Sequence, residues 1–480
     1  MGLSDLFKGK EEMDLTSGDI AKPLFFLSLP IVITNLLQTA YNLADTFWLA
    51  QVNEVALAAI TFGFPMVFLL ISLGMGLSVA GSVLVAQHTG AEEPREAEYA
   101  ASQTVMFAFV ASAILGIVGF FAVDTVLWTL GARGAVLREA TRYMEVISLG
   151  MPFLFGFFVF ISLMRGYGDT ITPMLVMFGT VVLNVVIDPL FIFGFGPIPD
   201  GLGVQGAAIA TVISRFVATV VGIAIMFRGN RGVQIRLSQM RPDLAFFKKM
   251  LGIGVPASIE GTGRSVSVNL MLIVIAIFSS GFVAAFGVGI RIFSVIFLPA
   301  IAVGQGVETM VGQNIGAGKY DRAKRTADTA AIGMFAALSV LAVVVFAFTE
   351  PIVSPLSPNE EVTDIAVTFL RVVAPTFGFI GVMRSYNGAF RGSGKTMVSA
   401  AIAITMLGVI RLPIAWVLSR GIDPVASMVP FATGQAGIWA SFVVSNTLGA
   451  IIAFAWFRRG TWRGADVRGR GAVDPSPTDD

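Results

Sequence analysis

The chain has 480 residues, of which 55% are hydrophobic and only 13% are charged. The charged share is about half of the ~25% that is usual in soluble domains, so an ordinary soluble domain is excluded. Cysteine is absent, which excludes disulfides and thiolate metal sites, and the net charge of +1 gives no indication of a nucleic-acid partner. We therefore expect a partner in the lipid bilayer and none among nucleic acids.

Apolar runs recur along the whole chain, and each is long enough to cross a hydrocarbon core of ~30 Å. The predicted fold class is an all-α polytopic membrane protein with twelve transmembrane helices. The twelve spans are expected at 23–49, 55–86, 99–123, 137–164, 171–194, 206–227, 246–278, 282–311, 325–348, 363–390, 396–419 and 435–457. Prolines inside these spans are candidate kinks, namely Pro30, Pro65, Pro152, Pro256, Pro299 and Pro375.

The two halves of the chain repeat one another at a fixed spacing. The segment Arg165-Gly-Tyr-Gly-Asp-Thr170 matches Arg391-Gly-Ser-Gly-Lys-Thr396, where 391 − 165 = 226. Gln87-His-Thr-Gly-Ala91 matches Gln313-Asn-Ile-Gly-Ala317 at the same offset. The repeat predicts two pseudo-symmetric six-helix lobes with the same topology, an arrangement typical of transporters.

The repeat and the span positions together predict the domain boundaries. We expect an N-lobe at 23–227 with spans 1–6 and a C-lobe at 246–457 with spans 7–12, joined by a cytoplasmic linker at 228–245. A cytoplasmic segment at 1–22 precedes the lobes, and a disordered cytoplasmic tail at 458–480 follows them.

The distribution of Lys and Arg over the loops predicts the orientation. The linker side is strongly basic, whereas the opposite side offers Arg133, Arg138 and Arg420. Because positive charge is retained in the cytoplasm, both termini should be cytoplasmic, which agrees with an even number of spans. No cleaved signal peptide is recognisable at the N-terminus. The expected location is the cell membrane, inner or plasma, and we expect a monomer.

Carboxylates inside apolar runs are the candidate functional residues. Asp45 lies in the first span and Asp188 in the fifth, where burial of a charge is expensive and usually functional. Each is either a structural acid paired with an arginine or a site that binds H⁺ or Na⁺. Asn184, Tyr41, Gln38 and Thr211 can hydrogen-bond the acids in either state. A possible Na⁺ site comprises Asp45, Asn184 and Asp188.

Glu260 in span 7 is a secondary candidate in the C-lobe. Arg264 follows it by four residues, so a structural ion pair within one helix is an equally good interpretation. At the 226 offset Asp45 corresponds to Met271, and Asp188 corresponds to Ile414. The fold therefore does not require the acids of the N-lobe, and the group around Asp45 and Asp188 is the richer in polar neighbours.

No cofactor or enzymatic chemistry is indicated. The segment 389–396 looks like a relaxed phosphate-binding loop, but it follows a span, and its repeat partner has Asp169 in place of Lys395. A phosphate-binding loop should follow a strand in a soluble α/β domain. We interpret the segment as a tight turn that both lobes share.

The chain resembles the multidrug and toxic compound extrusion (MATE) family, and within it the DinF-type prokaryotic branch. The resemblance covers residues 17–460. It rests on Leu29-Pro30-Ile-Val-Ile-Thr-Asn35, Tyr41-Asn-Leu-Ala-Asp45-Thr-Phe-Trp48, Gln87…Gly90-Ala91, Arg165-Gly-Tyr-Gly-Asp169-Thr170, Asn184…Asp188-Pro189, Val255-Pro256-Ala-Ser-Ile-Glu260 and Gly312-Gln313-Asn314-Ile-Gly316-Ala317-Gly318.

The resemblance implies a cation-coupled antiporter. Such a protein exchanges H⁺ or Na⁺ for organic, mainly cationic, drugs by alternating access through a central cleft between two lobes. In the DinF-type branch the implied coupling cluster matches Asp45, Asn184, Asp188 and Thr211. In the NorM-type branch a span 7 glutamate, here Glu260, works with a span 10 aspartate, but span 10 has no acid beyond Asp364 at its outer end.

Two alternatives to the antiporter remain open at this stage. One is a lipid-linked oligosaccharide flippase of the same superfamily, whose cleft should be basic. The other is a non-transporting membrane protein, such as a receptor, or an intramembrane enzyme. The sequence decides neither the substrate nor the choice between H⁺ and Na⁺.

Overall fold

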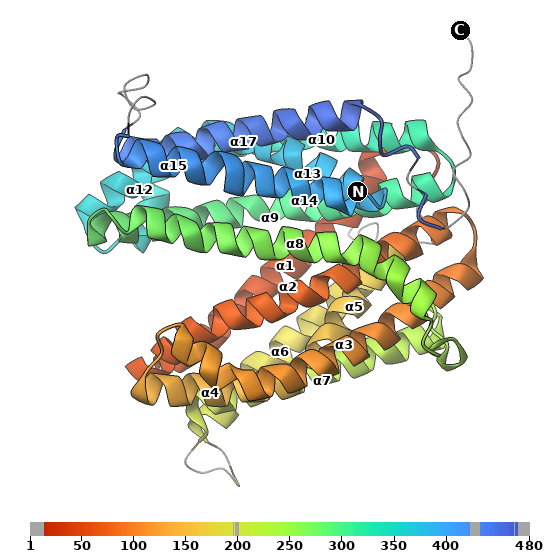
Figure 1. Ribbon diagram of the computed structural model, residues 1–480, viewed down its shortest axis with the longest axis horizontal. Helices are drawn as coiled ribbons and strands as arrows, with labels where there is room; N and C mark the ends of the chain where they lie inside the picture. Colours follow the sequence, from red (N-terminus) through yellow and green to blue (C-terminus); the bar gives the residue numbers. More distant parts are fainter. Residues whose placement is uncertain (1–13, 195, 197–200, 423–432, 465, 469–480) are drawn as a thin grey trace. The chain divides into compact units, whose positions relative to one another are not determined.

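The computed structural model describes residues 14–194, 196, 201–422, 433–464 and 466–468. Within these residues the secondary structure is helical and contains no strand, which confirms the predicted fold class (Figure 1). The predicted segment 1–22 and the predicted tail 458–480 fall partly on residues 1–13, 465 and 469–480, which lie outside the described residues.

The helices of the first half follow the predicted spans closely. Their bounds are α1 (Ala21–Ala50), α2 (Glu54–Gly90), α3 (Pro94–Thr129), α4 (Gly134–Leu149), α5 (Met151–Tyr167), α6 (Ile171–Phe193) and α7 (Gly203–Arg228). A short helix, η3 (Leu237–Gln239), lies in the linker that joins α7 to the second half.

The second half repeats this order. It comprises α8 (Leu244–Ile275), α9 (Ser280–Gly316), α10 (Tyr320–Ala347), α11 (Thr349–Val353), η4 (Ser354–Leu356), α12 (Glu360–Val373), η5 (Ala374–Thr376), α13 (Phe377–Gly392), α14 (Thr396–Ile404), the π-helix η6 (Thr405–Arg411), α15 (Leu412–Ser419) and α17 (Gln435–Arg458).

Ten helical stretches of the described residues are long and apolar enough to cross a membrane, counting the broken stretches Glu360–Gly392 and Thr396–Ser419 once each. The bent pair α4 and α5 makes one further span, with an angle of 56° between its two helices. The helix α8 does not pass this test, because Glu260, Arg264 and its other polar residues lower its hydropathy. With 32 residues it is nevertheless long enough to cross, and it completes the predicted twelve.

The chain separates into two compact units. Unit 1 comprises Met1–Ser17 and Leu29–Ser258, and unit 2 comprises Gly18–Ser28 and Ile259–Asp480. The first turns of α1 therefore pack with unit 2, where Arg322 on α10 donates hydrogen bonds to the carbonyl oxygens of Gly18 and Asp19.

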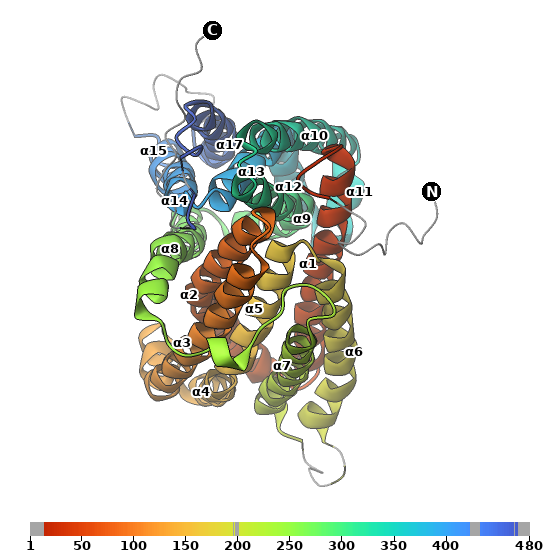
Figure 2. The same ribbon diagram turned by 90° about the vertical axis from the view of Figure 1, so that its right-hand side faces the viewer.

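Equivalent helix pairs pack together in both units. In unit 1, α5 lies against α2, α3 and α7. In unit 2, α13 lies against α9, α10 and α17, which surround it in Figure 2. The helix α13 therefore has neighbours in unit 2 that are equivalent to those of α5 in unit 1. The internal repeat predicted from the sequence is thus also found in the way the helices pack.

The Arg-Gly-x-Gly segment forms the same tight turn in both units. Gly168 has φ +107°, and Gly394 has φ +82°. Side chains other than glycine are strained at such values, which explains why glycine stands at both positions. In unit 1 Asp169 accepts hydrogen bonds from the backbone of Ile171 and Thr172, so it caps the start of α6.

A second glycine of this segment allows two helices to cross closely. A Cβ atom on Gly166 would lie 2.4 Å from the carbonyl oxygen of Ser82, and one on Gly392 would lie 2.2 Å from that of Glu308. Both separations are far below van der Waals contact. Small residues at such crossings let membrane helices pack backbone to backbone.

Two predicted kinks are breaks between helices. The span at 137–164 breaks at Gly150, next to Pro152, and the span at 363–390 breaks at η5, which contains Pro375. Pro30 lies inside a helix that continues through it. The π-helix η6 was not predicted. It ends at Arg411, two residues before Pro413, whose ring cannot accommodate the carbonyl group four residues earlier, so the helix widens there.

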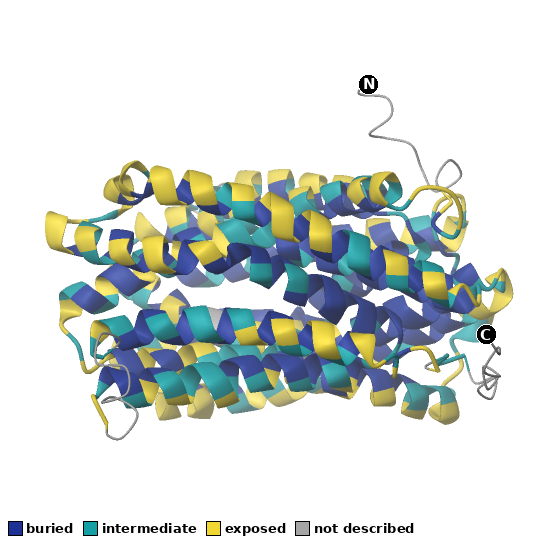
Figure 3. Ribbon diagram, turned by 90° about the horizontal axis from the view of Figure 1, so that it is seen from above, coloured by how far each residue is buried: buried dark blue, intermediate teal, exposed yellow. Residues whose placement is uncertain are grey.

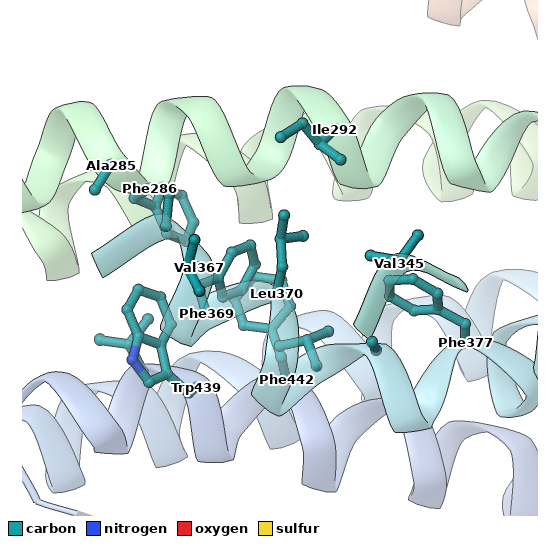
Figure 4. Packing of buried hydrophobic residues seen from close by; sticks show 14 of the residues in the cluster. Ala285, Phe286, Ile292, Val345, Val367, Phe369, Leu370, Phe377, Trp439 and Phe442 are labelled. Atoms are coloured by element: carbon teal, nitrogen blue, oxygen red, sulfur yellow. The ribbon is translucent and has the colours of Figure 1, made fainter. Parts of the chain in front are cut away.

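Each unit has its own apolar core. In unit 2 a cluster of aromatic side chains joins α9, α12 and α17, and Figure 4 shows Phe286, Phe369, Trp439 and Phe442 packed together. The rings of Phe369 and Trp439 lie 4.7 Å apart between centroids. Such contacts stabilise the packing beyond the burial of area alone.

The outer faces of the spans carry large exposed apolar side chains. Phe121 on α3 is 79% exposed, and Val343 on α10 is 68% exposed. Exposed residues follow the outward side of the helices in Figure 3. Lipid tails solvate such side chains, so this exposure is expected of a multi-pass membrane protein.

The predicted linker packs against unit 1. Arg236 pairs with Glu98 at the start of α3, with 2.7 Å between Nε and a carboxylate oxygen. Tyr99 donates a hydrogen bond of 2.7 Å to Asp243. Beyond α17, Trp462 stacks on Phe457 with 4.8 Å between ring centroids, so residues next to α17 pack onto unit 2.

Candidate functional site

The helices α1, α6 and α7 bring the predicted N-lobe acids together. Asp45 on α1 is 4% exposed, and Asp188 on α6 is 0% exposed. Asp188 and Thr211, the latter on α7, lie close enough to Asp45 to act on its charge. Asn184 donates a hydrogen bond of 2.9 Å to Asp188 from one turn earlier on the same helix. The i, i+4 spacing on α6 places both side chains on one face.

Several oxygens of this cluster have no hydrogen-bond partner among the residues that the structure describes. These buried atoms are Asp45 Oδ1, Asp188 Oδ2, Asn184 Oδ1, Thr211 Oγ1 and the Tyr41 hydroxyl. An unsatisfied polar atom in a protein interior costs about 1–3 kcal/mol, so an unpaired set needs an explanation. Carboxylate, amide and hydroxyl oxygens are the ligands that a hard cation such as Na⁺ prefers.

Arg215 belongs to the cluster, although we did not predict it as a site residue. It lies one turn after Thr211 on α7 and is buried. Its guanidinium lies 4.6 Å from the centre of the Tyr41 ring and donates a hydrogen bond of 2.9 Å to Gln38. The spacing of four from Thr211 was the available signal, because it places both residues on one helix face.

The cluster has an unequal number of charges. Two carboxyl groups lie close together, and one buried arginine lies beside Tyr41. Two negative charges in contact repel strongly in a medium of low dielectric constant. With both acids ionised the cluster carries one excess negative charge, and a single bound H⁺ or Na⁺ would neutralise it. Gln38 hydrogen-bonds Arg215 and Asn42 rather than the acids.

Glu260 lies in unit 2, in a network of its own. Arg391 approaches its two carboxylate oxygens at 3.2 and 3.4 Å, and Arg264 approaches one of them at 3.4 Å. Ser399 donates a hydrogen bond of 2.8 Å to the other oxygen. The predicted pairing of Glu260 with Arg264 is present, but Arg391 is the closer partner.

Two members of this network were not predicted from the sequence. Glu308 on α9 is 2% exposed and accepts a hydrogen bond of 2.9 Å from Arg391. Its signal was available, because it is an acid inside the predicted span 282–311. Arg391 belongs to the segment that we interpreted as a tight turn. It lies in the last turn of α13 and bridges Glu260 and Glu308.

Within the described residues no group of three or more His, Cys, Asp or Glu side chains could hold a metal ion. A cation in unit 1 would therefore depend on the two carboxyl groups of Asp45 and Asp188 together with neutral oxygens. Such a ligand set suits a weakly bound ion that must be released, rather than a permanent structural metal.

Comparisons with known proteins agree with this architecture. The MatE family model matches residues 30–190 and 256–417, two segments whose starts are 256 − 30 = 226 residues apart. The chain is 27% identical over 396 residues to the probable multidrug resistance protein YoeA of Bacillus subtilis, covering 82% of this chain and 85% of the relative. It is 27% identical over 445 residues to the FAD transporter of Shewanella oneidensis, covering 93% of this chain and 96% of the relative.

A solved structure has the same fold. The crystal structure of MATE in the bent conformation superposes with a TM-score of 0.84 at 26% identity, covering 93% of this chain and 96% of that chain. Family, fold and helix properties together confirm a multi-pass membrane location. The family model matches both repeats and more than half of the residues, so the chain belongs to the MatE family, whose resemblance was recognised in its sequence.

Proposed function

We propose that this protein is a cation-coupled antiporter that exports drug-like organic compounds by alternating access. The observation that carries the proposal is the group of buried, unpartnered oxygens around Asp45 and Asp188. A membrane-embedded acid pair that can be neutralised by one H⁺ or Na⁺ is the device that such a transporter needs. The proposed coupling residues are Asp45, Asp188, Asn184, Tyr41, Gln38 and Thr211, and Arg215 joins them as a partner.

The coupling step is a change of charge. Binding of one cation removes the excess negative charge, after which the two carboxyl groups no longer repel and the helices that carry them can pack differently. A cation drives transport only if it binds one conformation more tightly than another. Arg215 sets the stoichiometry, because with it a single cation per cycle suffices for neutrality.

The names of relatives support an organic substrate. YoeA is called a probable multidrug resistance protein, and the Shewanella protein is called a FAD transporter. The family resemblance favours organic cations as substrates. The further proposed features are an inner or plasma membrane location with both termini cytoplasmic, lobes at 23–227 and 246–457, and a monomer.

Dye efflux from proteoliposomes tests the coupling. Gradients of pH and of Na⁺ are imposed separately, and the expected result is efflux driven by at least one of them. Asp45→Asn and Asp188→Asn should abolish the driven component while the protein still reconstitutes. Asp364→Asn, which removes an exposed acid from α12, is the matched control and should leave efflux unchanged. Full driven efflux in both N-lobe variants would refute coupling at this site.

A further inference from the structure

A cavity of about 370 Å³ lies within unit 2, among α8, α9, α13, η6 and α17. Its volume lies in the range of about 300–1,000 Å³ that is common for small-molecule sites. Its wall is mainly apolar and includes the rings of Phe286, Phe293, Phe297 and Phe442. The cavity is formed by residues of unit 2 and shares one residue, Arg264, with the ion pairs of Glu260.

The polar part of this wall is strongly basic. Arg264, Arg384 and Arg411 line the cavity, and no acid is among the described residues that line it. A drug-sized site usually has a few polar groups that orient an otherwise apolar ligand. Here three of these groups are guanidiniums, which match a carboxylate, sulfonate or phosphate with two parallel hydrogen bonds.

Two of the arginines have no counter-ion. Arg384 is 7% exposed, its Nε has no hydrogen-bond partner, and its guanidinium lies 4.6 Å from the centre of the Phe297 ring. Arg411 donates hydrogen bonds to Ser445 at 2.9 Å and Asn446 at 2.7 Å, both neutral groups. Among the described residues, neither arginine has an ion-pair partner. Arg384 is buried and Arg411 is partly buried. A cation withdrawn from solvent without a counter-ion is costly, so the pair favours binding of an anion.

The charge count around the cavity supports this reading. Arg264 shares Glu260 with Arg391, and Arg391 also takes Glu308. Two carboxylates therefore face four guanidiniums, those of Arg391 and the three lining arginines. The group keeps an excess of two positive charges, which opposes entry of an organic cation.

Comparison of the two repeats indicates that the fold does not require these three arginines. At the 226 offset Arg264 corresponds to Gln38, Arg384 to Phe158 and Arg411 to Val185. Unit 1 packs the equivalent helices together with none of the three guanidiniums. Arg411 also ends the π-helix η6, a widened turn of the kind that often occurs at functional sites.

We propose that the unit 2 cavity binds an organic anion with a planar apolar body. The acidic group lies between Arg384 and Arg411, and the body lies against the phenylalanine rings. This assigns a substrate class opposite in charge to the organic cations that the family resemblance implies. Only the transport of this anion rests on the proposed export function, since binding can be measured without it.

Two dyes with the same xanthene ring and opposite charge test the binding. The full chain is purified in nanodiscs of phosphatidylcholine, and fluorescence anisotropy is measured with fluorescein, an anion, and with rhodamine 6G, a cation. The expected result is saturable binding of fluorescein and at least tenfold weaker binding of rhodamine 6G. Equal binding of both dyes, or preference for rhodamine 6G, would overturn the proposal.

Variants locate the site. Arg384→Met and Arg411→Gln should each raise the Kd of fluorescein about tenfold or more, equivalent to about 1.4 kcal/mol. Arg384→Lys keeps the charge and should recover much of the affinity. Arg371→Gln removes an exposed arginine of α12 and is the matched control. Gly287→Leu leaves every arginine in place but fills the cavity, where a Cβ atom meets nothing within 4 Å, and should also abolish binding. Unchanged affinity in Arg384→Met, Arg411→Gln and Gly287→Leu would refute the site, and size-exclusion profiles verify that the variants are folded.

Two further measurements separate the possible sources of the anion and the two proposals. Nanodiscs that contain phosphatidylglycerol should leave fluorescein affinity unchanged if the occupant is a soluble anion, whereas strong competition would identify a lipid headgroup and overturn the soluble substrate class. Asp188→Asn should bind fluorescein normally while it loses driven efflux. Loss of driven efflux with intact fluorescein binding would support the coupling site and leave the cavity proposal unaffected. Absence of fluorescein binding in the unmodified protein would overturn the cavity proposal and leave the coupling proposal unaffected.

Discussion

Replacing Glu260 by glutamine tests whether this acid stabilises unit 2 or couples transport. Its carboxylate is buried and is shared by Arg264 and Arg391, with Ser399 as an additional donor. The variant leaves Arg391 with Glu308 alone and leaves Arg264 without an anion. Removing one partner of a buried ion pair typically costs about 3–5 kcal/mol.

The expected loss lies at the lower end of that range. The glutamine amide oxygen can still accept a hydrogen bond from Ser399, and Glu308 still neutralises Arg391. We therefore expect the free energy of unfolding to fall by about 3 kcal/mol. This corresponds to a melting temperature lower by about 3 °C in a chain of this size. The assay is thermal unfolding in nanodiscs, followed by tryptophan fluorescence.

A surface ion pair gives the matched control. Glu139 lies 3.1 Å from Arg142, a shorter distance than any that Glu260 makes to an arginine, but the Arg142 side chain is exposed and the Glu139 side chain is partly exposed. Such pairs contribute about 0–1 kcal/mol, so Glu139→Gln should melt within about 1 °C of the unmodified protein. If Glu260→Gln melts as Glu139→Gln does but loses driven efflux, Glu260 takes part in coupling and the structural interpretation is wrong.

Three other variants have defined outcomes. Gly392→Ala places a methyl group 2.2 Å from the carbonyl oxygen of Glu308, so we expect the yield of folded protein to fall severalfold on size-exclusion chromatography, and a normal yield would contradict the tight crossing. Arg215→Gln leaves the acid pair without its arginine, so half-maximal efflux should require a lower concentration of the driving cation, and a higher requirement would contradict the charge count. The Tyr99 hydroxyl donates to Asp243 and holds the pKa of that carboxyl below its usual range. The contact therefore stabilises the fold fully at pH values above the usual pKa of an aspartate, and this stabilisation is lost as the pH falls through the lowered pKa. The protection factors of the linker amides, which correct for the intrinsic pH dependence of hydrogen exchange, should therefore fall at low pH. Tyr99→Phe should weaken this dependence, because the backbone amides of Ala245 and Phe246 still donate to Asp243.

Local features of the sequence predicted most of the fold. The twelve spans follow from apolar length, and the repeat follows from short motifs at one offset, because lipid leaves the backbone little choice but helix. The breaks next to Pro152 and Pro375 were predictable, since proline removes a backbone donor. The π-helix before Pro413 was not, because whether a helix breaks, bends or widens at proline depends on its neighbours.

The candidate sites were predictable only in part. Asp45 and Asp188 stand out because each is a carboxylate in an apolar run. Arg391 did not, because an arginine near the end of a span can equally reach the headgroups. Arg215 did not, because its spacing of four from Thr211 shows a shared helix face but not which acid that face meets. Only the packing of helices far apart in sequence decides which acid an arginine meets. The basic cavity of unit 2 is lined by residues from five different elements, so no single stretch of the sequence predicts it.

The two repeats have acquired opposite chemical characters on one scaffold. The first carries carboxyl groups in excess of its arginine, and the second carries guanidiniums in excess of its acids. A symmetric dimer of two identical halves would give both halves the same side chains and could not hold this difference. Fusion into a single chain lets each copy specialise while fixing their ratio at one to one, so every molecule is made with one acidic and one basic compartment.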